Sequence, residues 1–331
     1  METTQRTVSA PGTQKGSPSI ALFGASGAIG KSVAAALREQ GRAYRVVGRS
    51  AAALQQNFGD DPLAEIVCWD TDDAASMRAA ARGIDTVIYL VGVDYWKFDQ
   101  HPVLMQKTLE AAIAENVRHF VLSGTVYPYG MPTTGKVKED HPRQPHTFKG
   151  QMRKQQEDLL MAADRAGKIR GTVLRLPDFY GPGVDKSLLD SVFKAALGGP
   201  RAMMIGPIDT PHEFVYVPDA GPALLALADN DKAYGRVWHF AGADVISQRQ
   251  LAGKIFAQAG SKPRMLVFRK WMIRLLGLFD HFMRELVEMH YLQTSPVLMD
   301  DSDLRKLLPG LVKTSYEQGI KQTLAAMRAS A

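Results

Sequence analysis

Three glycines at a fixed spacing constrain the fold of this chain more than any other feature. Gly24, Gly27 and Gly30 lie between an apolar run, residues 20–23, and a segment of helix-forming residues. In such a turn the first glycine permits a tight reversal, the second lets the backbone approach a diphosphate, and the third lets the helix pack closely on the sheet. The anion then lies at the positive end of the helix. The motif predicts a βαβ unit that binds a dinucleotide.

A second phosphate-binding pattern overlaps these residues and fails. Gly30-Lys31-Ser32 is similar to the end of the pattern G-x-x-x-x-G-K-[ST]. That pattern requires a glycine five residues before Gly30, where the sequence has Ala25. We therefore favour the dinucleotide interpretation.

The first half of the chain alternates between short apolar runs and segments with helical periodicity. The expected strands are residues 20–23, 44–47, 65–69, 86–91, 119–122 and 171–176, and the expected helices are residues 31–40, 74–82, 103–116 and 151–166. Short apolar runs joined by helices are typical of a parallel sheet covered on both faces. We predict an α/β fold with a doubly wound, Rossmann-type sheet over residues 19–176. Residues 177–331 are expected to form a smaller substrate-binding region, part of which returns to the sheet, and residues 1–18 a flexible tail.

The composition excludes several other classes of protein. The 331 residues are 45% hydrophobic and 22% charged, which is ordinary for a soluble globular protein. The net charge of +6 is not gathered in one run, so it predicts no nucleic-acid partner. No segment approaches the roughly 20 apolar residues of a membrane span, and residues 1–18 lack a signal-peptide core. We expect a cytoplasmic protein, in which the single Cys68 is a small buried hydrophobe rather than a reactive thiol.

Residues 268–291 are predicted to form one helix with an apolar face and several basic residues. Such a helix suits either a membrane surface or packing against the cofactor domain. Asp280, Glu285 and Glu288 dilute its basic face, so we favour packing against the cofactor domain.

The residues after the second expected strand bear on cofactor preference. An acidic residue there would bind the adenosine ribose and repel a 2′-phosphate, whereas Arg49 offers that phosphate a charge-assisted contact. We therefore predict NADP(H) in preference to NAD(H), the alternative being a solvated surface arginine. Asp70, which follows the third expected strand, either meets the adenine amino group or caps a helix together with Thr71.

With these features in place, the chain resembles the extended and atypical short-chain dehydrogenase/reductases, the NAD(P)-dependent epimerase/dehydratase superfamily, over residues 19–325. The resemblance rests on residues 24–30, 70, 85–92, 120–127, 174–183 and 214–219. It implies an enzyme that acts on a small-molecule substrate, and a homodimer through the helices at residues 103–116 and 151–166. The implied cofactor-binding residues are Gly24, Ser26, Gly27, Ala28, Ile29, Gly30, Arg49, Asp70, Val91, Gly92, Lys149, Pro177 and Phe179.

The catalytic pattern of the superfamily is altered. Alignment on Tyr127 makes Ser123 the hydroxyl that stabilises charge on a substrate oxygen. The usual Tyr-x-x-x-Lys pair is missing; anchoring on Glu157 puts Lys149 in place of the tyrosine and Arg153 in place of the lysine. The two would share one helix face, and we expect the fixed charge of Arg153 to make Lys149 usable as an acid or base. Arg153 is also a candidate to hold the nicotinamide ribose.

Alternatives remain for each of these assignments. Counting without a gap aligns Phe148 and Met152 instead, which can do no proton chemistry, or both charges are solvated remnants of a lost pair. Tyr127 could supply the missing phenol or serve only in packing.

Two further residues are candidate substrate contacts. Asp178 is either such a contact or a turn former. His212 and Glu213 lie where the family often has Arg or Lys on a sugar diphosphate, which weakens a sugar-nucleotide interpretation. His141 and His146 lack the spacing of metal ligands, and we predict no metal site.

The main functional hypothesis is an NADP(H)-dependent oxidoreductase that transfers hydride to a carbonyl, or to a carbonyl-conjugated C=C, of a small apolar substrate. One alternative is a sugar-nucleotide epimerase or dehydratase, against which the missing tyrosine counts because those reactions need a strong base. Another is a nonenzymatic NADP(H)-sensing regulator, which the retained Ser123 disfavours.

Overall fold

A computed structural model describes residues 17–185 and 187–329 of the chain. Residues 1–16 of the expected tail lie outside the described residues. Within the described residues, no helix combines the length and the apolar character needed to cross a membrane.

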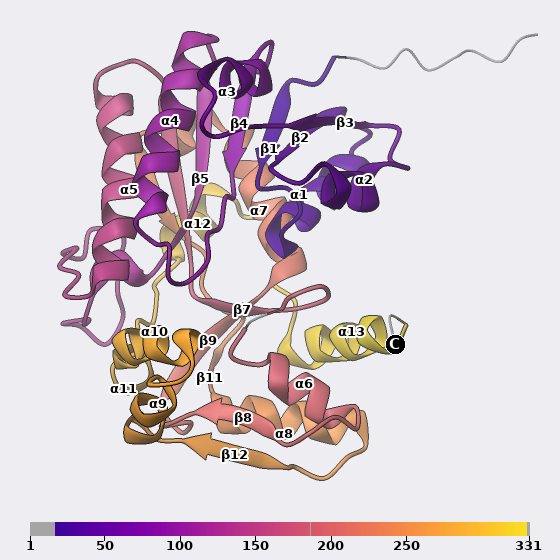
Figure 1. Ribbon diagram of the computed structural model, residues 1–331, viewed down its shortest axis with the longest axis vertical. Coiled ribbons are helices and arrows are strands. Elements are labelled where there is room, and N and C mark those ends of the chain that lie inside the picture. The colour runs from indigo at the N-terminus through magenta and orange to yellow at the C-terminus, as the bar shows by residue number, and fades with distance from the viewer. Residues whose placement is uncertain (1–16, 186, 330–331) are drawn as a thin grey trace, which may run out of the picture.

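A seven-stranded parallel sheet forms the upper half of the molecule (Figure 1). Its strands are β1 (Ile20–Phe23), β2 (Tyr44–Gly48), β3 (Ala64–Cys68), β4 (Thr86–Tyr89), β5 (His119–Thr125), β6 (Arg170–Leu176) and β10 (Arg236–His239). Their order is β10-β6-β5-β4-β1-β2-β3, so Ile20 lies between Tyr44 of β2 and Thr86 of β4. The chain reverses its direction of winding between β1 and β4, where sheets of this kind bind their ligands. The predicted α/β class and doubly wound sheet are confirmed.

Helices cover both faces of this sheet. On one face are α1 (Ala28–Glu39), α2 (Ala51–Phe58) and α7 (Val217–Ala228), and on the other are α3 (Ala74–Ala81), α4 (Gln100–Ala114) and α5 (Phe148–Arg165). Side chains alternate between the faces of a strand. Ile20 and Leu22 of β1 accordingly pack in one core cluster, and Ala21 and Phe23 in the other.

Two segments from beyond residue 177 complete this half. Strand β10 pairs with β6, and α7 packs on α1. The Ser32 hydroxyl of α1 donates to the Pro218 carbonyl and accepts from the Gly221 N–H, each at 3.0 Å. A Cβ at Gly221 would lie 2.3 Å from the Ser32 backbone, so only glycine permits this approach.

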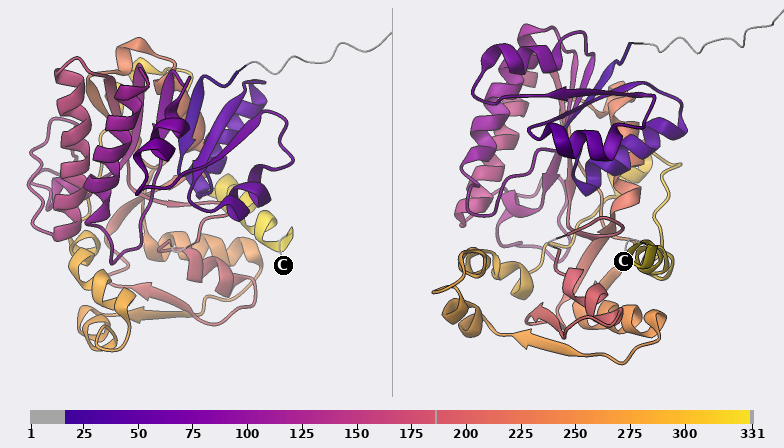
Figure 2. Two further views of the ribbon diagram at one scale, coloured as in Figure 1. Left: turned by 45° about the horizontal axis from the view of Figure 1, so that its top comes forward. Right: turned by 45° about the vertical axis from the view of Figure 1, so that its right-hand side comes forward.

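The lower half lies beneath the carboxyl ends of the parallel strands (Figure 1; Figure 2). It contains a sheet of β7 (Asp178–Tyr180), β9 (Pro211–Tyr216) and β11 (Val245–Ser247), and a pair, β8 (Ala202–Ile205) with β12 (Met265–Phe268). Around them lie α6 (Asp190–Ala196), α8 (Gln248–Ala259), α9 (Lys270–Leu276), α10 (His281–Met289), α11 (Tyr291–Thr294) and α13 (Tyr316–Ala329). Three further short elements contact the upper half: η1 (Tyr127–Tyr129), η2 (Asp231–Ala233) and α12 (Ser302–Leu307). A separate apolar cluster, which includes Tyr180, Phe193, Phe214 and Phe256, forms the core of this half.

The prediction that Cys68 is buried is wrong. Cys68 is exposed, and its thiol lies 3.3 Å from the Arg49 carbonyl oxygen. The physical reason is the position of β3, which is the edge strand of the sheet and is only partly covered. Apolar residues of an edge strand can stay exposed, whereas those of a central strand are covered by neighbouring strands and helices.

The prediction of a single helix over residues 268–291 is also wrong. Phe268 ends strand β12, and the rest divides into α9, α10 and α11. Helix α9 ends at Gly277, and the Asp280 side chain caps α10 by accepting from the Met283 N–H at 2.9 Å. The expected packing against the cofactor domain belongs to α10, whose Glu288 carboxylate accepts from the Lys149 N–H of α5 at 3.0 Å.

Candidate active site

The glycine motif borders a cavity of about 450 Å³ at the carboxyl end of β1. Its lining residues are Gly24, Ser26, Gly27, Ala28, Ile29, Gly30, Gly48, Arg49, Ser50, Ala53, Trp69, Leu90, Val91, Gly92, Phe179, Val184 and Asp185. Gly24 has a φ of +86°, and a Cβ at Gly30 would lie 2.3 Å from the Ala25 carbonyl oxygen. The backbone therefore forms a cradle that side chains would fill, at the start of α1. This geometry fits a dinucleotide.

Most of the cofactor-binding residues expected from the sequence line this cavity, but three do not. Arg49 lines it with an exposed side chain. Asp70 lies outside the lining; its carboxylate accepts from the Asp72 N–H at 2.9 Å, while Asp73 caps α3. The helix-cap alternative for Asp70 is therefore wrong. Pro177 and Lys149 also lie outside it, Pro177 against a neighbouring small cavity.

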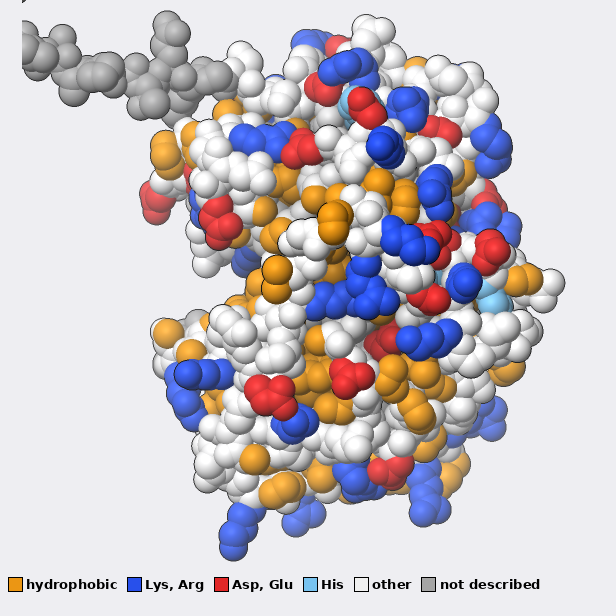
Figure 3. All heavy atoms as spheres, turned by 180° about the vertical axis from the view of Figure 1, so that it is seen from behind, with side chains coloured by type: hydrophobic (Ala, Val, Ile, Leu, Met, Phe, Trp, Pro, Cys, Tyr) orange, Lys and Arg blue, Asp and Glu red, His pale blue; other side chains and the backbone are white. Residues whose placement is uncertain are grey.

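A second large cavity, of about 380 Å³, adjoins the first and shares Phe179 with it. Its lining residues are Tyr95, Tyr127, Asp178, Phe179, Ser187, Leu188, Asp190, Ser191, Met203, Ile205, Phe268, Ile273, Met283 and Leu286. The lining is mainly apolar, with two phenols and two carboxylates. Seen from behind, the surface has a notch at one side between the upper and lower halves of the molecule (Figure 3). We name the cavity of about 380 Å³ the substrate cavity.

Two tyrosines in the lining of the substrate cavity lie close together. The hydroxyl groups of Tyr95 and Tyr127 are 2.8 Å apart. Burial, followed by the proximity of Tyr95 and Asp178, raises the pKa of Tyr127 well above its usual value, while the charge of Arg153 opposes this rise. Burial also raises the pKa of Tyr95. Both phenols are therefore protonated at neutral pH and can donate a proton or a hydrogen bond.

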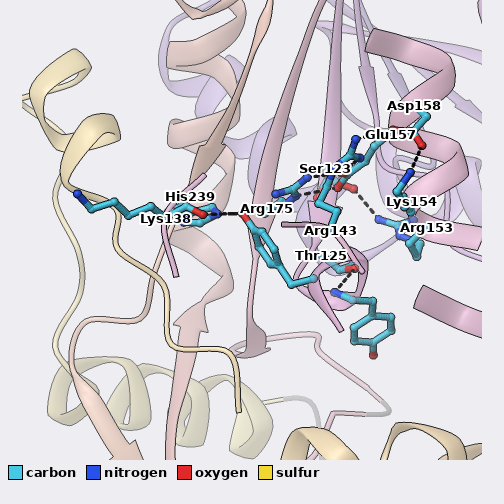
Figure 4. A network of polar contacts seen from close by, with 12 residues as sticks. Ser123, Thr125, Lys138, Arg143, Arg153, Lys154, Glu157, Asp158, Arg175 and His239 are labelled. Atoms are coloured by element: carbon cyan, nitrogen blue, oxygen red, sulfur yellow. Dashed lines mark hydrogen bonds and ion pairs between the residues drawn. The ribbon is translucent and has the colours of Figure 1, made fainter. Parts of the chain in front are cut away.

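Arg153 fixes the end of β5 from helix α5. Its guanidinium donates to the Ser123 carbonyl oxygen at 2.9 Å (Figure 4). It also contacts His101 Nδ1 at 3.2 Å. Burial, and secondly Arg153, lowers the pKa of His101 to about 2, so its ring is neutral and can accept this bond. One turn further along α5, Glu157 accepts from Arg175 of β6 at 2.5 and 3.0 Å. Arg153 is therefore held against the sheet rather than solvated.

Lys149 lies one turn before Arg153 on α5 and is 1% exposed. Its ammonium donates to the carboxylates of Glu285 and Glu288, and lies 5.3 Å from the ring centre of Tyr95. The lysine is absent from the lining of the substrate cavity. Arg153 contacts Ser123 and His101 rather than Lys149, so the structure does not join Lys149 and Arg153 in a direct pair.

Asp178 and His212, both predicted as substrate contacts, are brought together. The His212 Nε2 and Asp178 Oδ2 atoms are 2.6 Å apart, on neighbouring strands β7 and β9. Both line a cavity of about 70 Å³ that also touches Tyr127. Glu213 lines it too, and burial raises the pKa of this carboxyl to about 7. Glu213 accepts from the Met299 N–H at 3.1 Å, which holds it in place.

Comparison with known proteins identifies the family to which the chain belongs. A model described as the NAD dependent epimerase/dehydratase family matches residues 20–240. The chain belongs to this family.

The sequences of individual relatives differ widely from that of this chain. It is 27% identical over 258 residues to a dTDP-6-deoxy-L-talose 4-dehydrogenase (NAD(P)(+)) from Kitasatospora kifunensis, covering 73% of this chain and 79% of that protein. It is 26% identical over 260 residues to a dTDP-glucose 4,6-dehydratase from Streptomyces griseus, and the match covers 73% of this chain and 79% of that protein. The fold is similar to that of a dTDP-glucose 4,6-dehydratase from Bacillus anthracis in complex with NAD, with a TM-score of 0.79, 14% identity and coverage of 95% and 97%.

Family membership confirms the resemblance seen in the sequence and makes the chain an NAD(P)-dependent enzyme. Sequence reasoning missed three residues of its site. Tyr95 follows β4 in an irregular segment without a motif, and Glu285 and Glu288 lie more than 130 residues from the lysine that they contact. Among the described residues, no group of three or more His, Cys, Asp or Glu side chains is arranged to hold a metal ion.

Proposed function

We propose that this family member transfers hydride between NAD(P) and a carbonyl- or hydroxyl-bearing carbon of a sugar nucleotide, with Tyr127 as the proton donor. The observation that carries the proposal is the side chain of Phe179, which lines both the cofactor cavity and the substrate cavity. Phe179 would adjoin a nicotinamide held in the cofactor cavity, and that group would supply or accept the hydride. Tyr127 lines the substrate cavity together with Phe179, so its phenol can meet the substrate oxygen there.

Each polar group then has a role in carbonyl reduction. Tyr127 gives its proton to the substrate oxygen as the hydride reaches carbon, and Tyr95 hydrogen-bonds the phenol. Arg153 stabilises the negative charge that develops on Tyr127, which is the task that a lysine has in the family pattern. Ser123, on the strand end that Arg153 fixes, polarises the substrate oxygen. Asp178, which His212 of the neighbouring strand holds in place, contacts the substrate.

The relatives favour the sugar-nucleotide alternative over the small apolar substrate that was our main expectation. They are named for reactions on dTDP- and UDP-linked sugars. One observation keeps the small apolar carbonyl as a second candidate. Among its described lining residues, the substrate cavity has eight Met, Ile, Leu or Phe residues and no Lys or Arg for a diphosphate.

A single substrate panel distinguishes the two candidates. Purified protein is incubated with NADPH or NADH and either dTDP- and UDP-linked 4-keto sugars or matched aldehydes, ketones and enones. We expect NAD(P)H oxidation with a keto-sugar nucleotide. UDP- and dTDP-hexoses with NAD(P)+ are followed by NMR, because epimerisation leaves no net cofactor change. Turnover of the apolar carbonyls alone would move the assignment to the second candidate, and tight cofactor binding without turnover on any substrate would contradict both.

The preference for NADP(H) also stays part of the proposal, and Arg49 tests it. Arg49 lines the cofactor cavity, and its side chain forms no ion pair with another described residue. Charge-assisted hydrogen bonds contribute about 1.5–3 kcal/mol. Arg49→Gln should therefore weaken NADPH binding by about 10–100-fold while leaving NADH binding within about twofold. Titration calorimetry measures both affinities, with Arg42→Gln, which lies outside the lining of the cofactor cavity, as a control. Equal losses for the two cofactors would contradict a 2′-phosphate contact.

The homodimer implied by the family resemblance, through α4 and α5, remains a prediction.

A further inference from the structure

An apolar surface of unusual exposure covers α9 and the turn after it. We name it the α9 patch; it consists of Trp271, Leu275, Leu276, Leu278 and Phe279, whose exposed fractions are 62%, 55%, 39%, 68% and 90%. The patch lies at the lower left corner of Figure 1, in the half remote from the sheet. Large apolar side chains gathered in one exposed segment indicate a surface that binds something.

Basic side chains surround the patch. Arg269, Lys270 and Arg274 lie in the same segment, all exposed, and none of them forms an ion pair within the described part of the chain. Arg284 of α10 is also exposed and donates to the Gly277 carbonyl at 3.1 Å. The single acidic residue of the segment, Asp280, is engaged in capping α10. The surroundings of the patch are therefore positively charged.

We infer that the α9 patch docks on an anionic membrane surface, with Leu278 and Phe279 inserted at the level of the headgroups. An apolar segment with exposed tryptophan and flanking cations suits an interface where apolar side chains are buried while lysine and arginine meet lipid phosphates. Phe279 and Leu278 project from a turn, so a deformable lipid surface accommodates them without a matching pocket. A second copy of the chain fits less well, because symmetric pairing would bring these cations against one another.

Helices α9 and α10 connect this surface to the substrate cavity. Ile273 of α9 is buried and lines that cavity, as do Met283 and Leu286 of α10. The docked face of the enzyme is therefore the outer side of a cavity wall. Docking itself does not depend on the substrate class and goes beyond the proposed reaction.

Sedimentation of the full chain with vesicles tests the inference. Vesicles of phosphatidylcholine alone are compared with vesicles that contain phosphatidylglycerol, at low and high salt. We expect binding to the anionic vesicles, weakened by salt and weak or absent with the neutral ones. The double variant Leu278→Ser/Phe279→Ser should bind at least about tenfold more weakly. The double variant Arg269→Gln/Arg274→Gln should have a lower affinity for the anionic vesicles, by about fivefold for each cation removed.

Matched controls separate docking from unfolding. Val312→Ser removes an apolar side chain that is 76% exposed outside the patch, and Lys321→Gln removes an exposed cation elsewhere; both should bind vesicles like the wild type. NADPH affinity and thermal unfolding should be unchanged in every variant. Failure of the wild type to bind anionic vesicles, or equal binding to both vesicle types, would overturn the inference. So would a dimer in solution that the Leu278→Ser/Phe279→Ser change dissociates.

Discussion

Replacing Tyr127 by phenylalanine is expected to lower kcat by about 10²–10⁴-fold, the usual contribution of a positioned general acid. The change removes one oxygen from the lining of the substrate cavity and leaves the ring in place. Because Tyr127 does not line the cofactor cavity, NAD(P)H affinity should remain within about twofold of the wild type. Stopped-flow measurement of hydride transfer, together with cofactor titration, checks both expectations.

Tyr95→Phe is the matched control for this experiment. It removes the same atom from the partner phenol, 2.8 Å away, without removing the proposed donor. We expect a loss of about tenfold, corresponding to one neutral hydrogen bond. A larger loss in Tyr95→Phe than in Tyr127→Phe would reassign the proton donor to Tyr95. Full activity in both variants would refute a phenol as the acid.

Lys149→Met should destabilise the fold, because it leaves two carboxylates facing each other beside α5. Removing one member of a buried ion pair costs about 3–5 kcal/mol. Glu285 and Glu288 retain 23% and 25% side-chain exposure, so we expect a smaller loss in the free energy of unfolding, of about 2–4 kcal/mol. Urea denaturation of the cofactor-free protein measures it.

The companion variants decide what Lys149 does. Lys149→Arg keeps the charge and should recover most of the stability. Adding Glu285→Gln and Glu288→Gln to Lys149→Met should also recover part of it, because the repulsion is removed. The opposite pattern, in which Lys149→Met unfolds like the wild type but loses turnover, would restore Lys149 as the acid or base that the sequence suggested.

The sequence predicted the sheet better than it predicted the site, for a physical reason. A central strand such as β1 is buried on both faces, so its apolar run reads directly as a strand. Cys68 lies in a similar run, but the position of its strand at the edge depends on pairing that no local pattern contains. The interruption after α9 is visible locally only as Gly277 and the cap at Asp280.

The site depends on contacts between distant segments. Alignment located Ser123 and Arg153, which the structure joins by a hydrogen bond. It could not show that Lys149 meets Glu285 and Glu288, because the position of α10 is set by the packing of the lower half. Tyr95 belongs to an irregular segment, in which neither periodicity nor spacing marks a functional side chain.

Strand β10 and helix α7 lie late in the sequence, and this affects folding while the chain is being synthesised. While the ribosome has made only residues 1–200, β6 has no neighbour on its outer side, and the Ser32 face of α1 lacks the α7 helix that covers it. An unpaired strand edge beside an uncovered apolar face is prone to associate with other chains. All seven strands are therefore available to the sheet only after residue 239 has left the ribosome, and a fragment that stops at residue 176 has β6 in place of β10 as its exposed edge.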